Sequence, residues 1–288
     1  MGRPYQGRIG GASFGRNAVD LNAKGPFHAW MGGSLVELSD AASVDRAAQT
    51  LFGSALDSRP LVSHSGAVWN DPESELLTTL RIGEYQPKND LDFLSLHIAR
   101  ARADAIVITG KILRDEPSLR YDLRADARWG DALVEWRERR WGLWEPPWLL
   151  ILTGSGHLDF AHPAFHGWAR PVIFTSDRTA ERKLADSPVP VVADAEPDIR
   201  KAIHHLHAGR ACQCVSIEAG PSTAVSLYER PTAVNELLLS VYLGKTLDDR
   251  AKGSPLIELA SLRRRFRSET SATHRSQGQH WSFHRFRR

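Results

Sequence analysis

Strand-like and helix-like patterns alternate from about residue 59 to residue 242, and this alternation constrains the fold more than any other feature. Short apolar runs are followed by segments whose apolar residues recur every three or four positions. Such alternation predicts an α/β fold with a mostly parallel sheet and helices on both faces. The expected strands are residues 60–62, 105–108, 148–152, 171–175, 189–192, 215–217 and 236–242.

The segments between these strands include four expected helices. Asn89 can cap the first, because Leu91, Leu94 and Ile98 then share one helix face. The other three are expected over residues 129–148, 199–207 and 223–229. Near the C-terminus, residues 266–275 and 280–286 are joined by Ser-Gln-Gly and predict a hairpin that forms an antiparallel edge of the sheet.

The first 58 residues form a separate compositional zone. Glycine is dense up to Gly33, and residues 34–56 then become helix-like. We therefore expect an N-terminal extension of unknown role over residues 1–58 and one domain over residues 59–288.

Four turns carry residues suited to binding an anion. In parallel sheets, ligands bind beyond the carboxyl ends of the strands, which here indicates residues 109–120, 153–156, 176–178 and 218–223. In the last turn, Gly220 allows close backbone approach, and Ser222 and Thr223 lie at an expected helix N-terminus. The alternative for each turn is a plain structural connection.

Composition excludes several classes of protein. No apolar run approaches the roughly 20 residues that a transmembrane helix needs, and the N-terminus lacks the apolar region of a secretion signal. We expect a cytoplasmic enzyme with no membrane partner. Cys212 and Cys214 are too few and too close for a disulfide framework or a zinc site, so we expect no metal.

Arginines are concentrated near the C-terminus. Such a cluster suits nucleic acid or an anionic ligand, but a solvated strand face is the commoner explanation, and we expect no nucleic-acid partner. The cluster consists of Arg263, Arg264, Arg265, Arg267, Arg275, Arg285, Arg287 and Arg288.

Five motifs resemble, in order and spacing, the reductase domain of the riboflavin-biosynthesis deaminase–reductases. They are Arg-Pro-Leu-Val at 59–62, Arg-Ala-Arg-Ala-Asp-Ala-Ile at 100–106, a loose match at 110–119, Leu-Thr-Gly-Ser at 152–155 and Glu-Ala-Gly-Pro at 218–221. The resemblance covers residues 59–288 and implies a dihydrofolate reductase-like fold. It also implies an NADPH-dependent reductase that forms dimers, so we expect a homodimer.

The resemblance further implies a substrate and a set of site residues. The substrate is 5-amino-6-(5-phosphoribosylamino)uracil or a related ribosylamino-pyrimidine phosphate. Asp71 falls about where a catalytic or orienting aspartate belongs. The residues expected to contact the cofactor are Gly110, Asp115, Ser155, Gly220, Pro221, Ser222 and Thr223, and those expected to face the substrate are Arg100, Leu119 and Glu218.

The chain departs from the family's pattern in several places. The Ser-Leu-Asp-Gly block is not kept, and Ala219 stands where a glycine is expected. Neither of the deaminase domain's zinc motifs is present in the sequence. Two alternatives therefore stay open: a catalytically weakened relative that binds a nucleotide or a partner, and a reductase of the same fold that acts on another heterocycle.

Overall fold

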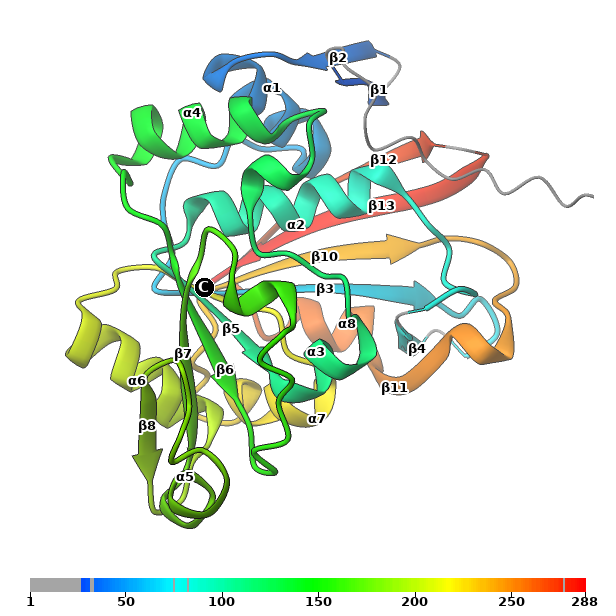
Figure 1. Ribbon diagram of the computed structural model, residues 1–288. Coiled ribbons are helices and arrows are strands. Elements are labelled where there is room, and N and C mark those ends of the chain that lie inside the picture. The colour runs from blue at the N-terminus through cyan, green and yellow to red at the C-terminus, as the bar shows by residue number, and fades with distance from the viewer. Residues whose placement is uncertain (1–26, 32–33, 75, 82, 277) are drawn as a thin grey trace, which may run out of the picture.

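The computed structural model describes residues 27–31, 34–74, 76–81, 83–276 and 278–288 (Figure 1). A small sheet pairs β1 (Phe27–Met31) with β2 (Ser34–Leu38). The strands of the main sheet are β3 (Val62–Asn70), β4 (Leu76–Leu80), β5 (Ala105–Thr109), β6 (Trp148–Leu152), β7 (Arg170–Ser176), β8 (Val191–Asp194), β9 (Val215–Ile217), β10 (Glu236–Tyr242), β11 (Lys252–Glu258), β12 (Ser268–Ser276) and β13 (Gln279–Arg287). The helices are α1 (Ala41–Phe52), α2 (Asp90–Arg102), α3 (Gly110–Asp115), α4 (Gly130–Trp141), α5 (Asp177–Lys183), α6 (Ile199–Arg210), α7 (Pro221–Ala224) and α8 (Leu259–Arg263).

The main sheet has the strand order β12-β13-β10-β3-β9-β5-β6-β7-β8. From β10 to β8 each strand runs parallel to its neighbour, whereas β13 and β12 continue the sheet antiparallel. This confirms the predicted fold class, including its antiparallel C-terminal edge. Strands β4 and β11, which the sequence did not predict, pair with each other beside the carboxyl half of β3.

Helices cover both faces of this sheet (Figure 1). Helices α1, α2 and α4 pack with Trp281 and Phe283 of β13 into one apolar core. Helix α6 and residues of α8 pack with Ile217 and Phe286 into the core of the opposite face. Within the described ranges, no helix combines the length and apolarity that crossing a membrane would require.

Local sequence signals set most of the boundaries, with two corrections. Asn89 caps α2 as expected, since its side-chain oxygen accepts a hydrogen bond from Leu91 N at 2.8 Å. The continuous helix expected over 34–56 is wrong, because 34–38 is a strand and α1 begins only after the capping box of Asp40 and Ser43. The helix expected over 129–148 is too long, because α4 ends at Gly142 in the left-handed conformation.

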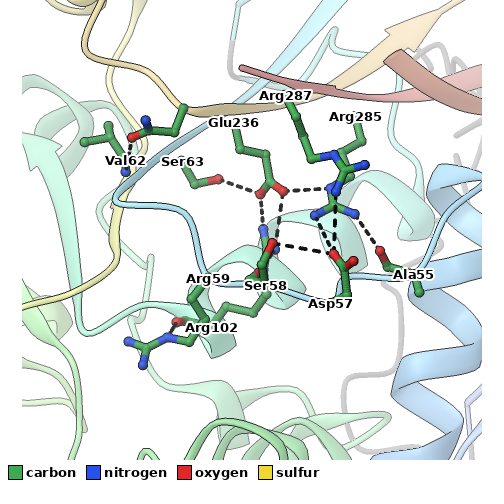
Figure 2. Close-up of polar contacts among 11 residues, drawn as sticks. Ala55, Asp57, Ser58, Arg59, Val62, Ser63, Arg102, Glu236, Arg285 and Arg287 are labelled. Carbon is green, nitrogen blue, oxygen red and sulfur yellow. Dashed lines mark hydrogen bonds and ion pairs between the residues drawn. The ribbon is translucent and has the colours of Figure 1, made fainter. Parts of the chain in front are cut away.

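A buried ionic cluster ties residues 55–58 to the sheet (Figure 2). Glu236 on β10 is 1% exposed and pairs with Arg102 of α2 and with Arg285 of β13, whose Nε donates to Oε1 at 2.7 Å. The Nη1 of Arg285 donates to the carbonyl of Ala55 at 2.5 Å, and its Nη2 lies 3.5 Å from the carboxylate of Asp57. The charged residues that hold the segment before β3 therefore come from α2, β10 and β13.

Glycine at the end of α1 is required by a close backbone approach. Gly53 has φ +68°, and a Cβ there would lie 2.7 Å from the carbonyl oxygen of Ser271 on β12. Gly142 ends α4 with φ +66°, and a Cβ on it would meet no heavy atom within 4 Å.

We expect Gly142→Ala to cost about 1–2 kcal/mol of unfolding free energy, from left-handed strain alone. Gly53→Ala should cost about 1–3 kcal/mol more, because the methyl group also overlaps backbone.

Urea unfolding of both variants and the wild type measures the difference. Equal losses for the two variants would contradict the docking of α1 against β12.

Candidate functional site

The carboxyl ends of four neighbouring strands form one edge of the main sheet. Strands β9, β5, β6 and β7 lie next to one another in this order and run parallel. The four turns singled out from the sequence therefore lie along the same edge, as expected. Because ligands of such sheets bind beyond the carboxyl ends of the strands, this edge is the candidate site.

The turns after β6 and β7 are joined by hydrogen bonds. Thr179 Oγ1 donates to the carbonyl oxygen of Gly154 at 3.1 Å, and Lys183 Nζ donates to that of Ser155 at 2.8 Å. The loop over 153–156 is thus held against α5, with Ser155 partly exposed at the edge. The predicted contact of Ser155 with a cofactor stays a prediction.

The turn after β5 packs closely on the turn after β6. Gly110 is buried, and a Cβ on it would lie 3.2 Å from both Thr153 Oγ1 and the side chain of Leu158. A small residue is therefore needed where the two turns meet. Asp115 lies at the exposed end of α3, where it forms an ion pair with Lys111 one helical turn earlier.

The turn after β9 exposes its backbone at Gly220. A Cβ on Gly220 would meet no heavy atom within 4 Å, so a ligand can approach the main chain there. Pro221 begins α7, followed by the exposed Ser222 and the partly buried Thr223. Helix α7 has only four residues, so its dipole contributes less to anion binding than the longer helix expected over 223–229.

Ala219 does not obstruct this turn. Its side chain is 6% exposed and belongs to the apolar core that contains Ile217 and Leu227, so its methyl group points away from the exposed edge. Its carbonyl oxygen lies 3.4 Å from Nε2 of His64, whose Nδ1 lies 2.5 Å from Tyr228 Oη. Burial lowers the pKa of His64 to about 4, so the ring is neutral, with Nε2 donating and Nδ1 accepting.

Arg100 and Glu218, both predicted to face the substrate, contact each other. Arg100 Nε and Nη2 donate to the two carboxylate oxygens of Glu218 at 2.8 and 2.7 Å. The two side chains are 4% and 7% exposed, and the guanidinium lies 4.6 Å from the centre of the Tyr121 ring. Among the described residues, Arg100 Nη1 has no hydrogen-bond partner, so this nitrogen can still donate to a ligand.

Burial and charge act in opposite directions on the pKa of Arg100. Burial disfavours the charge on Arg100, but the Glu218 carboxylate outweighs it and the pKa of Arg100 is raised. Burial also raises the pKa of the nearby Glu116 carboxyl and that of Tyr121. Arg100 is therefore a permanent cation at the end of α2, beside a phenol that stays protonated.

Asp92 is a candidate residue that sequence reasoning missed. It lies in the first turn of α2, eight residues before Arg100. Burial raises its pKa to about 6, although a hydrogen bond with Ser240 of β10 opposes the shift. A carboxyl that holds its proton near pH 6 is suited to general acid chemistry. The sequence feature that could have indicated a polar site here is Ser240, a polar residue at an inward position of the mostly apolar run Glu-Leu-Leu-Leu-Ser-Val-Tyr.

Further hydroxyl groups line the sheet under α2. Ser65 of β3 and Ser216 of β9 carry buried hydroxyls that have no hydrogen-bond partner among the described residues. Unpaired buried hydroxyls are uncommon, since each costs free energy unless a water or a ligand satisfies it. The strand face beneath α2 is therefore polar near the candidate site.

Asp71 and Leu119 lie in other surroundings. Asp71 follows β3 directly and accepts hydrogen bonds from Glu73 N at 3.0 Å and Ser74 Oγ at 2.7 Å, which lower its pKa. These bonds shape the turn between β3 and β4. Leu119 is partly buried against the core that contains Ile106 and Ile108. The roles predicted for both residues stay predictions.

Solved structures share this fold. A pyrimidine reductase-like protein from Corynebacterium diphtheriae superposes with a TM-score of 0.56 and 19% identity, over 84% of this chain and 98% of that one. Acinetobacter baumannii RibD superposes with a TM-score of 0.51 and 14% identity, over 80% of this chain and 58% of that one. No protein-family model and no curated protein matches the sequence.

The strand order and the solved structures that share it show an α/β fold of the dihydrofolate reductase-like class, as the sequence predicted. Within that class, the chain has the fold of the pyrimidine reductase-like protein and of RibD.

Proposed function

We propose that the chain is an NADPH-dependent reductase of the riboflavin-biosynthesis type. Its substrate would be 5-amino-6-(5-phosphoribosylamino)uracil or a related ribosylamino-pyrimidine phosphate. The observation that carries the proposal is the meeting of an open turn at Gly220 with the Arg100–Glu218 pair at one sheet edge, in a fold shared with a pyrimidine reductase-like protein. A cytoplasmic homodimer remains part of the proposal.

Two observations support the cofactor side of the proposal. The main chain at Gly220 is approachable, and the extra methyl group of Ala219 lies in the core. NADPH, when bound, would supply the hydride. The residues proposed to hold it are Gly110, Asp115, Ser155, Gly220, Pro221, Ser222 and Thr223.

On the substrate side, charge and proton supply come from α2. Arg100 would donate through its unpaired Nη1 to an anionic group of the substrate, while Glu218 holds the guanidinium in place. Asp92 is a better proton donor than Asp71, because the pKa of Asp92 is raised whereas that of Asp71 is lowered. Leu119 would contribute apolar contact.

The test of cofactor placement is a fluorescence titration with NADPH and NADH. Gly220→Asp should weaken NADPH binding by at least about tenfold, because a carboxylate would face the pyrophosphate and block backbone approach. The matched control is Gly167→Asp, at an exposed glycine before β7 and therefore at the opposite edge of the sheet. If Gly220→Asp binds NADPH as the wild type does, the proposed pyrophosphate site is wrong.

Measuring turnover distinguishes the proposed reductase from two alternatives. NADPH binding without reduction of the pyrimidine would favour a weakened relative or a reductase of another heterocycle. If turnover is absent, the occupation of Arg100 Nε and Nη2 by Glu218 would explain a weakened relative, because only Nη1 is then left for a substrate group. No NADPH binding at all would leave a binding protein without redox chemistry.

A further inference from the structure

Four arginines that the proposed reductase does not use line a cleft of about 930 Å³. The cleft lies between the loop after α7, the end of α8 and the last residue of the chain. Its lining contains none of the residues proposed for the cofactor or the substrate. The lining residues are Val225, Tyr228, Glu229, Arg230, Pro231, Thr232, Arg264, Arg265 and Arg288.

Two of these arginines help to build the cleft. Arg265 Nη1 donates to the carbonyl oxygen of Tyr228 at 3.2 Å, and Arg288 Nη1 donates to that of Thr232 at 2.5 Å. From outside the lining, Arg200 donates to three further carbonyl oxygens of the same loop. The loop that forms one wall is therefore fixed by guanidinium groups.

The other two arginines keep most of their donors unused. Arg264 Nη2 donates to Ser261 Oγ at 2.6 Å, and Arg230 has no hydrogen bond among the described residues. None of the four arginines forms an ion pair with a described residue, although the carboxylate of Glu229 also belongs to the lining. Four guanidinium groups against the Glu229 carboxylate and the α-carboxylate of Arg288 still leave an excess of positive charge that an anion would neutralise.

We propose that this cleft binds a phosphorylated small molecule of about nucleotide size. One guanidinium group can donate two parallel hydrogen bonds to two oxygens of a phosphate group. A cleft lined by several arginines therefore suits a phosphate or diphosphate group. The volume lies in the range of small-molecule sites. Val225, whose side chain is 58% exposed, and Tyr228 offer apolar contact to the remainder of the ligand.

A nucleic acid fits these observations less well. A polynucleotide needs a stripe of positive charge that follows its backbone, whereas these four arginines line a single cleft. The whole chain carries a formal net charge of only +3. The site does not depend on the proposed reductase function, because it shares no residue with it.

The test is calorimetric titration with inorganic pyrophosphate in the Gly220→Asp background, which removes the proposed cofactor phosphate site. Arg230→Gln combined with Arg264→Gln should weaken pyrophosphate binding by at least about tenfold, because charge-assisted hydrogen bonds are lost while the loop contacts of Arg265 and Arg288 remain. The matched control is Arg263→Gln, since Arg263 is adjacent in sequence, pairs with Glu269 and lies outside the lining. The control should change binding by less than about twofold.

Three outcomes would overturn the proposal. One is no pyrophosphate binding at millimolar concentration in the Gly220→Asp background. Another is equal weakening by the double variant and by Arg263→Gln, which would indicate non-specific attraction. The third is tighter binding of a short single-stranded oligonucleotide than of pyrophosphate, with the same dependence on Arg230 and Arg264, which would favour a nucleic-acid site.

Discussion

Replacing Glu236 with glutamine is expected to lower the free energy of unfolding by about 3–5 kcal/mol, because it leaves two buried arginines without their shared counter-charge. Arg102 and Arg285 are each about 1% exposed, so water cannot replace the carboxylate. Part of Arg285 is also paired with Asp57 and Ala55, which limits the loss. Urea unfolding followed by circular dichroism measures the change.

The control is a surface pair of the same chemistry. Asp248→Asn removes an exposed bidentate contact with Arg250 and should lower the free energy of unfolding far less than Glu236→Gln does, because water screens the exposed pair. A loss below about 1 kcal/mol for Glu236→Gln would contradict a stabilising role for the buried cluster.

The cost of Glu236→Gln also depends on pH. Burial by itself raises the pKa of Glu236, but Arg102 and Arg285 outweigh it, so the folded pKa lies below its ordinary value of 4.5. A group with a lowered folded pKa contributes stability that is fully present above its unfolded pKa and is lost as pH falls through the folded pKa. The difference between Glu236→Gln and the wild type should therefore be constant above about pH 5 and shrink below pH 4.5.

Asp92→Asn is expected to lower kcat by about 10²–10⁴-fold, if the proposed reductase reaction holds, because the amide cannot supply the proton. Asp71→Asn is the matched control and should change kcat by less than about threefold, because Asp71 is engaged in its own turn. Steady-state kinetics with NADPH and the pyrimidine substrate measure both. If Asp71→Asn lowers kcat as much as Asp92→Asn does, or more, Asp71 and not Asp92 would be the proton donor.

The pH profile separates proton donation from a structural role of Asp92. A donor must be protonated, so kcat should fall as pH rises above about 6, the pKa of Asp92. Ser240→Ala removes a hydrogen bond that lowers this pKa, so the fall should move to higher pH. An unchanged profile in Ser240→Ala would contradict the assignment.

Local rules were enough to predict much of the fold. The cap at Asn89 and the mostly apolar runs over 148–152 and 236–242 depend on neighbours in sequence, and these elements lie where they were expected. Strands β4 and β11 were missed because each has mixed polar and apolar residues and is stabilised by the other, about 175 residues away. Residues 34–38 were misread because short apolar runs suit a strand and a helix alike.

The candidate site was predicted in part for the same reason. The four turns share an edge because parallel strands end on the same side, which alternation alone implies. The pairing of Arg100 with Glu218 was not foreseen, since 118 residues separate them and each had been expected to face the substrate. Asp92 was hidden because an acidic residue in the first turn of a helix is common without any function.

The sequence by itself therefore determined the class of fold and the edge of the sheet at which a ligand would bind, because hydrophobic periodicity and turn residues act over short distances. Only the tertiary structure decided which charges are shared and which stay unpaired. It joined Arg100 to Glu218, gave Glu236 two arginines, and gathered Arg230, Arg264 and Arg288 on one cleft. Burial and charge pairing depend on groups that are distant in the chain, so the free energies and pKa values that govern function appear only once the chain is folded.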